Sequence, residues 1–154
     1  MSADIRPLAA GEIPALLPLV EQYWLFEDIA GFDPVPVGRE LARACADTRL
    51  ASGWIARVRG EPVGYLLAVY VFSLEHLGLT AEIDEFFVLP SARGKGFGEE
   101  LLRIAEAEFA RRGCTNVSLQ LGKGNDRARE FYRRQGYGER AGFELLDKML
   151  GRSA

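Results

Sequence analysis

The sequence predicts a single α/β domain whose central sheet is mixed and mostly antiparallel. The chain has 154 residues, 48% of them hydrophobic, which suits one globular domain with one core over residues 1–154. Its apolar periodicity alternates between the strand period and the helix period along the chain. Near Lys95 a glycine-rich segment joins a strand directly to a helix. The strand–helix–strand order around that segment predicts one βαβ crossover flanked by helices.

The first half of the chain is predicted to form a strand, two helices, a hairpin and a further strand. Pro18 stands inside the first helical pattern and is expected to kink or interrupt it. Two prolines, Pro34 and Pro36, favour a loop before the second helix. The expected elements are a strand at 5–8, a helix at 12–26, a loop at 31–38, a helix at 39–47, and strands at 54–59, 63–72 and 81–89.

The second half is predicted to alternate helices and strands. A helix from the glycine segment to about Arg112 carries one apolar stripe, and Gly113 is a natural stop. The stripe consists of Leu101, Leu102, Ala105 and Phe109. The remaining expected elements are a strand at 116–121, a helix at 126–134 and a last strand at 143–150.

Charge and composition exclude several classes of protein. The net charge of −3 argues against a nucleic-acid partner, and a single histidine, His76, makes a His/Cys metal site improbable. The longest apolar run, 63–72, is too short for a membrane helix, and the N-terminus lacks a signal-peptide core. Cys45 and Cys114 form no pair motif, which suits a reducing cytoplasm. We therefore expect a cytoplasmic protein without membrane or nucleic-acid partners and without a metal.

The charge is divided unevenly along the chain. Residues 1–90 hold 6 Lys+Arg against 13 Asp+Glu, whereas residues 91–140 hold 11 against 7. The acidic part could attract a cation and the basic part a small polyanion. The segment 93–98 lies just after this change of sign and has the form of an anion site, because glycines expose backbone N–H groups at a helix start. A flexible connection is the alternative reading of the glycines alone.

The glycine segment fits neither common nucleotide motif. The dinucleotide fingerprint needs a third glycine where Glu99 stands, and a P-loop needs Ser or Thr where Gly96 follows Lys95. Two longer blocks of the chain are Val88-Leu89-Pro90-x-x-Arg93-x-x-Gly96-x-Gly98 and Asn125-x-x-Ala128-x-x-Phe131-Tyr132-x-x-x-Gly136-Tyr137. These blocks resemble the two signatures of the GNAT superfamily of N-acetyltransferases, with Tyr137 where Phe is commoner. The resemblance is strongest over 53–137 and covers nearly the whole chain.

This resemblance implies a GNAT-like fold and acetyl-CoA as cofactor. In that family, amides of the glycine loop bind the pyrophosphate, and the preceding strand runs alongside the pantetheine arm. Asn125 would form a hydrogen bond to the cofactor, cap the helix that follows it, or do both. Arg129 could contact a phosphate of the cofactor or be a solvated charge on that helix. The implied cofactor-binding residues are Phe87, Val88, Leu89, Arg93, Gly94, Lys95, Gly96, Phe97, Gly98, Asn125 and Arg129.

Acetyl transfer to an amine needs a neutral amine and a stabilised leaving thiolate. Asp84 and Glu85 are candidate catalytic acids, but adjacent strand residues face opposite sides unless a bulge intervenes. The segment 83–88 resembles the matching strand of spermidine/spermine acetyltransferases. That match makes Asp84 the base and Glu85 the amine contact, and the reversed order of the acids leaves the two roles interchangeable. Tyr132 stands where the family has its general acid, and it could serve as a hydrogen-bond donor instead.

The acceptor remains open at this stage. Trp24, Glu27 and Asp28 follow the first helical stretch and are candidate acceptor contacts, although packing alone would make Trp24 and Phe26 core residues. A small cationic, polyamine-like primary amine is the first expectation. An amino acid, an antibiotic, a protein amine, or a catalytically silent acyl-CoA-binding module are the alternatives. A homodimer is compatible with the resemblance, because many relatives dimerise.

Overall fold

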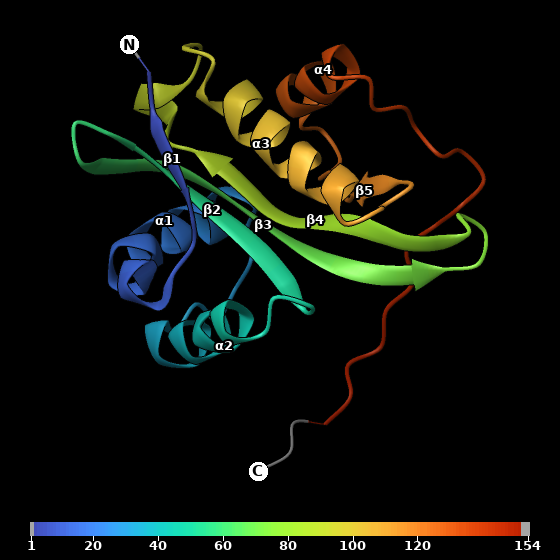
Figure 1. Cartoon of the computed structure of the whole chain (residues 1–154), viewed down its shortest axis with the longest axis horizontal. Coiled ribbons are helices and arrows are strands. Elements are labelled where there is room, and N and C mark those ends of the chain that lie inside the picture. Colours follow the sequence, from blue (N-terminus) through green and yellow to red (C-terminus); the bar gives the residue numbers. More distant parts are fainter. Residues whose placement is uncertain (1, 152–154) are drawn as a thin grey trace. The chain divides into compact units, whose positions relative to one another are not determined.

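The computed structural model describes residues 2–151. The chain forms two compact units, of which the first ends at Gly122 and the second begins at Lys123. Figure 1 shows the elements in chain order. The first unit contains β1 (Asp4–Pro7), α1 (Ile13–Phe26), α2 (Pro34–Ala46), β2 (Ala51–Val58), β3 (Glu61–Ser73), β4 (Gly78–Val88), α3 (Phe97–Arg111) and β5 (Val117–Leu119), and the second contains α4 (Asp126–Arg134).

The sheet of the first unit has the strand order β1-β2-β3-β4-β5. Its first four strands pair antiparallel, and β5 pairs parallel to β4 through α3. The expected mixed sheet with one βαβ crossover is therefore confirmed. The β4–β5 pairing ends at Ile83 and Leu119, so β4 continues to Val88 without a β5 partner.

Helices cover both faces of this sheet. Figure 1 shows α1 and α2 on one side and α3 on the other. The expected apolar stripe of α3 is buried as a whole, and Phe109 meets Trp54 of β2 with ring centroids 6.1 Å apart. The core between the sheet and the first two helices consists of Leu16, Leu19, Val20, Leu41, Ile55, Tyr65 and Phe87. The two faces of the sheet are thus distinguishable by the residues that they bury.

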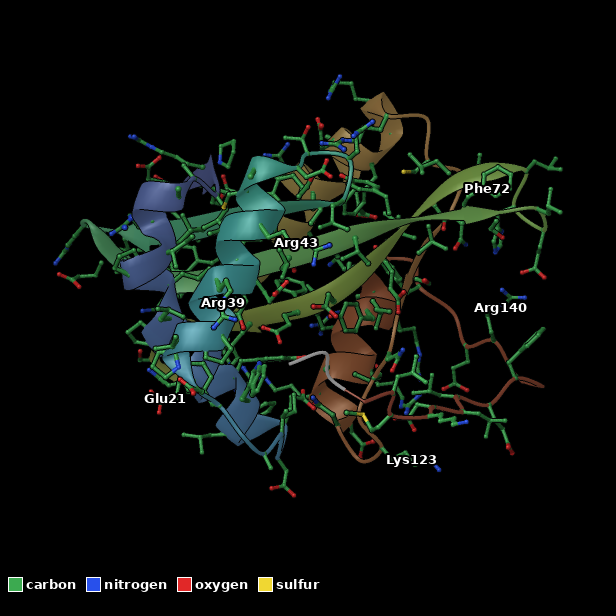
Figure 2. The ribbon with its side chains drawn as sticks, turned by 90° about the horizontal axis from the view of Figure 1, so that it is seen from below. Glu21, Arg39, Arg43, Phe72, Lys123 and Arg140 are labelled. Carbon is green, nitrogen blue, oxygen red and sulfur yellow. The ribbon has the colours of Figure 1, made fainter. Side chains whose placement is uncertain are left out.

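The β3–β4 hairpin extends past its neighbour β2. The pairing of β2 with β3 stops at Ala51 and Val69, while β3 runs to Ser73. Phe72, labelled in Figure 2, lies on this extension and is exposed. Among the helices of residues 2–151, none has both the length and the apolar character that crossing a membrane would require.

One extra residue in β4 interrupts the sheet where the two acids stand. Leu67 pairs with Glu85 and the next β3 residue, Ala68, pairs with Ile83, so Asp84 has no partner across the ladder. Opposed residues share a face and adjacent strand residues do not. Ile83 and Glu85 therefore lie on opposite faces although they are two residues apart. The bulge that this acid pair would require is present.

Several expected elements differ in the structure. The helix α2 begins at Pro34, so residues 34–38 are helical and not a loop, because Asp33 caps the helix by accepting from the Val35 N–H at 3.0 Å. Pro34 then occupies the first turn, where a missing N–H costs nothing. The strand expected at 116–121 shortens to β5. The interruption that was one of the two outcomes expected at Pro18 does not occur, because Pro18 lies inside α1, where Leu16, Leu19 and Val20 are buried.

The last strand predicted at 143–150 is absent. Within the described chain these residues form no helix or strand, and their apolar side chains are exposed. A strand needs a neighbour to accept and donate its backbone hydrogen bonds, which an apolar segment alone does not supply.

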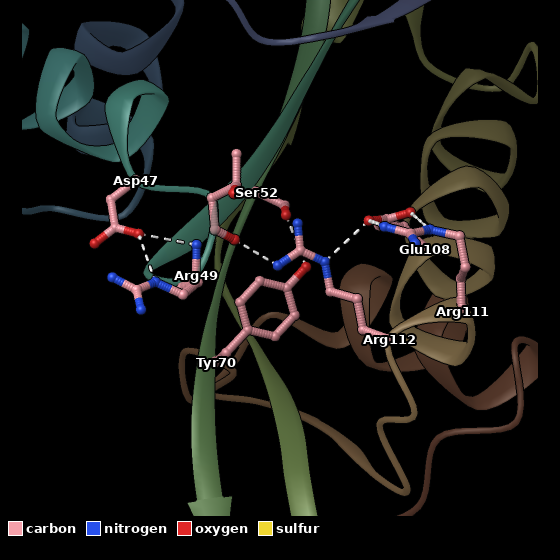
Figure 3. A network of polar contacts seen from close by, with 8 residues as sticks. Asp47, Arg49, Ser52, Tyr70, Glu108, Arg111 and Arg112 are labelled. Atoms are coloured by element: carbon pink, nitrogen blue, oxygen red, sulfur yellow. Dashed lines mark hydrogen bonds and ion pairs between the residues drawn. The ribbon is translucent and has the colours of Figure 1, made fainter.

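A polar network fastens the end of α3 to the sheet (Figure 3). Arg112 donates to Glu108 at 2.9 Å and to the carbonyl of Thr48, and its guanidinium lies 4.4 Å from the ring centre of Tyr70. Arg111 also donates to Glu108, at 2.7 and 2.6 Å. These hydrogen bonds lower the pKa of Glu108 to about 2.

The Glu108 network predicts a stability difference that depends on pH. A lowered pKa means that ionised Glu108 stabilises the fold above the ordinary carboxyl pKa, and that this stabilisation is lost as the pH falls toward 2. Glu108→Gln should lower Tm by about 2 °C at pH 6, since exposed pairs contribute little. Scanning calorimetry should show the difference shrinking toward pH 2, with Glu61→Gln as a neutral control. A difference that stays constant with pH would contradict this account.

Candidate active site

The glycine segment forms an open turn between β4 and α3. Gly94 and Gly96 have φ values of +76° and +85°, and Gly96 is the residue that caps α3. A Cβ built at either glycine meets nothing within 4 Å. Phe97, the first residue of α3, is buried and fixes the helix start. No side chain caps the start of α3, so its first backbone N–H groups have no side-chain acceptor there, an arrangement that favours an anion.

Arg93 is directed back toward the protein. Its Nε donates to the Val88 carbonyl at 3.0 Å, and its guanidinium lies 5.1 Å from the ring centre of Phe26 and 5.6 Å from that of Phe87. Lys95 bonds to the Ser91 carbonyl at 3.4 Å. Both cations expected at the cofactor loop thus stabilise the loop itself. The stacked Arg93 also connects the loop to the last turn of α1.

Glu85 is held by donors from two other elements. Tyr65 Oη of β3 donates to Glu85 Oε1 at 2.8 Å, and Trp24 Nε1 of α1 donates to Oε2 at 2.8 Å. Burial raises the pKa of Glu85 and so does the charge of Asp84, while the two hydrogen bonds oppose the rise. The net direction is upward, which brings the carboxyl group closer to neutral pH.

Asp84 differs from its neighbour in having a free carboxylate. It lies on the exposed side of the strand and makes no hydrogen bond or ion pair within residues 2–151. The surrounding protein still removes enough water to raise its pKa, and the charge of Glu82 adds to the rise. The two adjacent acids are therefore unequal: one is fixed by donors, and the other can exchange a proton.

The other residues expected at the acceptor end are placed differently. Trp24 joins the acids through its hydrogen bond and also packs against Phe32, with ring centroids 5.6 Å apart. Glu27 lies beside Gly122, where an added Cβ would stand 3.1 Å from its Oε2. Asp28 follows α1 in a left-handed conformation with φ of +57°. The structure thus brings Trp24 to the acids and places Glu27 near the end of β5.

The second unit contains the remaining predicted residues. Asn125 caps α4, since its side chain accepts from the Ala128 N–H at 3.2 Å. Arg129 donates to Glu139 at 2.6 Å. Tyr132 packs against Phe131 and Tyr137, with ring centroids 5.3 and 5.6 Å apart. The capping role that was open for Asn125 is therefore present.

Two residues of the site were missed by sequence reasoning. Tyr65 belongs to an apolar run, and its hydroxyl was a usable signal, because a buried tyrosine needs a hydrogen-bond partner. The identity of that partner depends on the register that places Tyr65 opposite Phe87, beside Glu85. Phe26 was expected in the core, but it is 52% exposed and stacks on Arg93.

The fold and site define an α/β acyltransferase. The sequence model of the Acetyltransferase (GNAT) family matches residues 17–137, and the chain therefore belongs to this family. Members of the family are N-acetyltransferases that use acetyl-CoA. No group of three or more potential metal ligands gathers anywhere in residues 2–151.

Relatives agree with this assignment. The chain is 28% identical over 144 residues to YhfO of Bacillus subtilis (strain 168), an uncharacterized N-acetyltransferase, covering 91% of this chain and 93% of YhfO. It is 36% identical over 83 residues to the aminoalkylphosphonate N-acetyltransferase of Salmonella typhimurium, or 54% of each protein. An integron cassette protein from the mobile metagenome of Cole Harbour Salt Marsh superposes with a TM-score of 0.83 at 27% identity, covering 97% of this chain and 91% of that one.

The loop has properties that suit an anion. Two glycines with positive φ precede a helix of 15 residues, and a Cβ at either glycine would project into open space. The acidic Glu99 and Glu100 in the first turn oppose an anion, so the backbone amides must supply most of the attraction.

The loop geometry predicts a binding defect without a folding defect. Gly96→Asn should weaken acetyl-CoA binding about tenfold or more, because asparagine tolerates a left-handed backbone but adds a side chain where Gly96 leaves open space at the helix start. Gly113→Asn, at the other end of α3 with φ of +83°, is the matched control and should bind normally. Calorimetric titration measures both. Equal affinities of the two folded variants would remove the loop from the cofactor site.

Proposed function

We propose that this chain is an acetyl-CoA-dependent N-acetyltransferase that transfers an acetyl group directly to a primary amine of a small cationic molecule. The family assignment supports the reaction. The unequal pair Asp84 and Glu85, at the bulge of the strand that leads into the glycine loop, supports the acceptor. The proposed cofactor contacts are the backbone of 87–89 and 94–98, with Asn125 and Arg129 of the second unit added from the motif.

Asp84 is the proposed base. An amine with a pKa of about 10.4 is protonated at pH 7, and neutralising it costs about 4 to 5 kcal/mol. A carboxylate that is free of hydrogen bonds and has a raised pKa can accept this proton, directly or through one water. Loss of the proton leaves a nitrogen lone pair for attack. The direction of the shift favours this role, since a base works best near the operating pH.

Glu85 is the proposed contact for positive charge on the acceptor. Its oxygens are fixed by Trp24 and Tyr65, so its charge stands at a defined place beside Asp84. Glu27 and Asp28 would extend the acidic lining of the acceptor wall. This division of labour is the one that the resemblance to spermidine/spermine acetyltransferases implies.

Tyr132 is the proposed donor to the leaving group. Bound acetyl-CoA supplies an acetyl group activated as a thioester, and Tyr132 Oη would donate a hydrogen bond to the charge that develops on sulfur. A phenol is a weaker acid than a thiol, so hydrogen bonding suffices and complete proton transfer is unnecessary. This role is supported by the motif position of Tyr132 in the second unit.

The proposal extends to assembly and location. A homodimer remains a prediction that sedimentation of the purified chain tests. A cytoplasmic location is supported by Cys45 and Cys114, which are both free thiols.

A panel of acceptors tests the substrate class. Thiol release from acetyl-CoA should be fastest, in kcat/KM, with putrescine or spermidine, and slower with glycine or aminomethylphosphonate. Asp84→Asn should lower kcat about 100-fold without changing the KM for acetyl-CoA, and Glu61→Gln, on the neighbouring strand β3, should not. If the aminoalkylphosphonate is preferred, as the name of the Salmonella relative suggests for that protein, the cationic acceptor is wrong. An active Asp84→Asn enzyme would remove Asp84 as the base.

Tyr132→Phe tests the proposed donor. Loss of one hydrogen bond to a charged group should lower kcat about tenfold to 100-fold, with little change in acetyl-CoA affinity. The control is Tyr137→Phe, which removes a hydroxyl from the ring that packs against Tyr132. Single-turnover thiol release distinguishes chemistry from product release. Unchanged single-turnover rates in Tyr132→Phe would exclude this role.

A further inference from the structure

The Glu85 carboxylate has one donor for each oxygen, and each donor comes from a different element. Tyr65 Oη of β3 and Trp24 Nε1 of α1 both lie 2.8 Å from their acceptor atoms. Packing does not require the hydroxyl of Tyr65, because phenylalanine fills nearly the same volume as tyrosine. Tyr65 is only 2% exposed, and its hydroxyl donates to Glu85. The hydrogen bond to Glu85 therefore accounts for a tyrosine at this position.

We propose that Tyr65 and Trp24 are positioning residues that keep Glu85 ionised and oriented as the contact for the acceptor's positive charge, and so leave proton removal to Asp84. This inference rests on the proposed function. It assigns a role to Tyr65, which neither the motifs nor the acceptor-strand resemblance includes. It also makes Trp24 a residue that acts through Glu85.

Two neutral donors favour the charged form of the acid that they contact. Burial, the charge of Glu85 and the hydrogen bond all raise the pKa of Tyr65, so its hydroxyl stays protonated and remains a donor. Hydrogen bonding to a carboxylate stabilises the anion, whereas burial destabilises it. Removing either donor leaves only one hydrogen bond to oppose the effect of burial on the pKa of Glu85. The pKa of Glu85 should then rise further, and less of it is ionised at neutral pH.

The titratable groups around Glu85 are few. Asp84 is its neighbour on β4 and raises its pKa, and Tyr65 and Trp24 lower it. From α1, Tyr23 stands against Tyr65 with ring centroids 6.3 Å apart. Protonation of Asp84 at low pH would lower the pKa of Glu85, whereas the loss of a donor would raise it. The direction in which the pKa of Glu85 moves therefore distinguishes the effect of Tyr65 from that of Asp84.

The same contacts fasten the end of α1 to the catalytic strand. Trp24 bonds to Glu85, while Tyr23 and Phe26 stack on Phe87 with ring centroids 5.8 and 6.2 Å apart. The orientation of Glu85 and the position of the acceptor wall after α1 are thus set by one turn of helix. Loss of the Trp24 donor from this turn should therefore affect acceptor binding more strongly than cofactor binding.

The test is the pH dependence of kcat/KM for a cationic amine in Tyr65→Phe and Trp24→Phe. In each variant, the fall of kcat/KM at acidic pH should begin about one pH unit higher than in the parent protein. At pH values above this fall, kcat/KM should be within about twofold of the parent value. The KM for acetyl-CoA should not change. Tyr70→Phe is the matched control. It also removes a hydroxyl from β3, but the Tyr70 hydroxyl bonds to Ser52 and not to Glu85. A loss that is equal at all pH values, or no shift, would overturn the proposal.

A second readout needs no activity. Carbon-13 NMR of labelled glutamate, with the Glu85 signal assigned from Glu85→Gln, should show a higher pKa of Glu85 in Tyr65→Phe than in the parent. An unchanged pKa would overturn the positioning role. A raised pKa with an unchanged rate profile would overturn the role of Glu85 as acceptor contact. If the parent acetylates no amine while the NMR shift is present, the proposed function fails and the positioning of Glu85 stands.

Discussion

The extra residue in β4 is the constraint from which the arrangement of the site follows. A regular strand would place Asp84 and Glu85 on opposite faces and Ile83 on the same face as Glu85. Because the ladder skips Asp84, Ile83 stays opposite Ala68 while Glu85 turns toward Tyr65 and α1. The core and the acid pair are thus accommodated on one strand. The bulge costs one unpaired position and yields two carboxylates with different surroundings.

The surroundings of the two acids carry the chemical argument. Both have raised pKa values because protein replaces water around them, but only Glu85 receives hydrogen bonds that oppose the rise. A fixed anion suits the binding of an ammonium, and an unbonded one suits proton transfer. The stacking of Arg93 on Phe26 and Phe87 links this acid pair to the glycine loop through the last turn of α1. The proposed acceptor and cofactor contacts therefore share one set of packed side chains.

Much of this could be predicted from local patterns. The α3 stripe, the glycine turn, the bounds of α4 and the family followed from periodicity and motif spacing. Other features depend on partners distant in sequence. Tyr65 reaches Glu85 only through the β3–β4 register, and Phe26 contacts Arg93 at the surface, where it is 52% exposed. The start of α2 was missed although Asp33 and Pro34 form a standard cap. The strand predicted at 143–150 failed because a local apolar pattern does not provide a neighbouring strand.

The central claim is that Asp84 and Glu85 together receive the acceptor amine. A crystal structure with an inhibitor that joins coenzyme A to a diamine tests it most directly. The account predicts that the linked nitrogen lies within about 3 to 3.5 Å of Asp84, or one water away, and that the distal ammonium contacts Glu85 with its bonds from Tyr65 and Trp24 intact. A diamine that leads away from both carboxylates, with coenzyme A seated at the glycine loop, would contradict it.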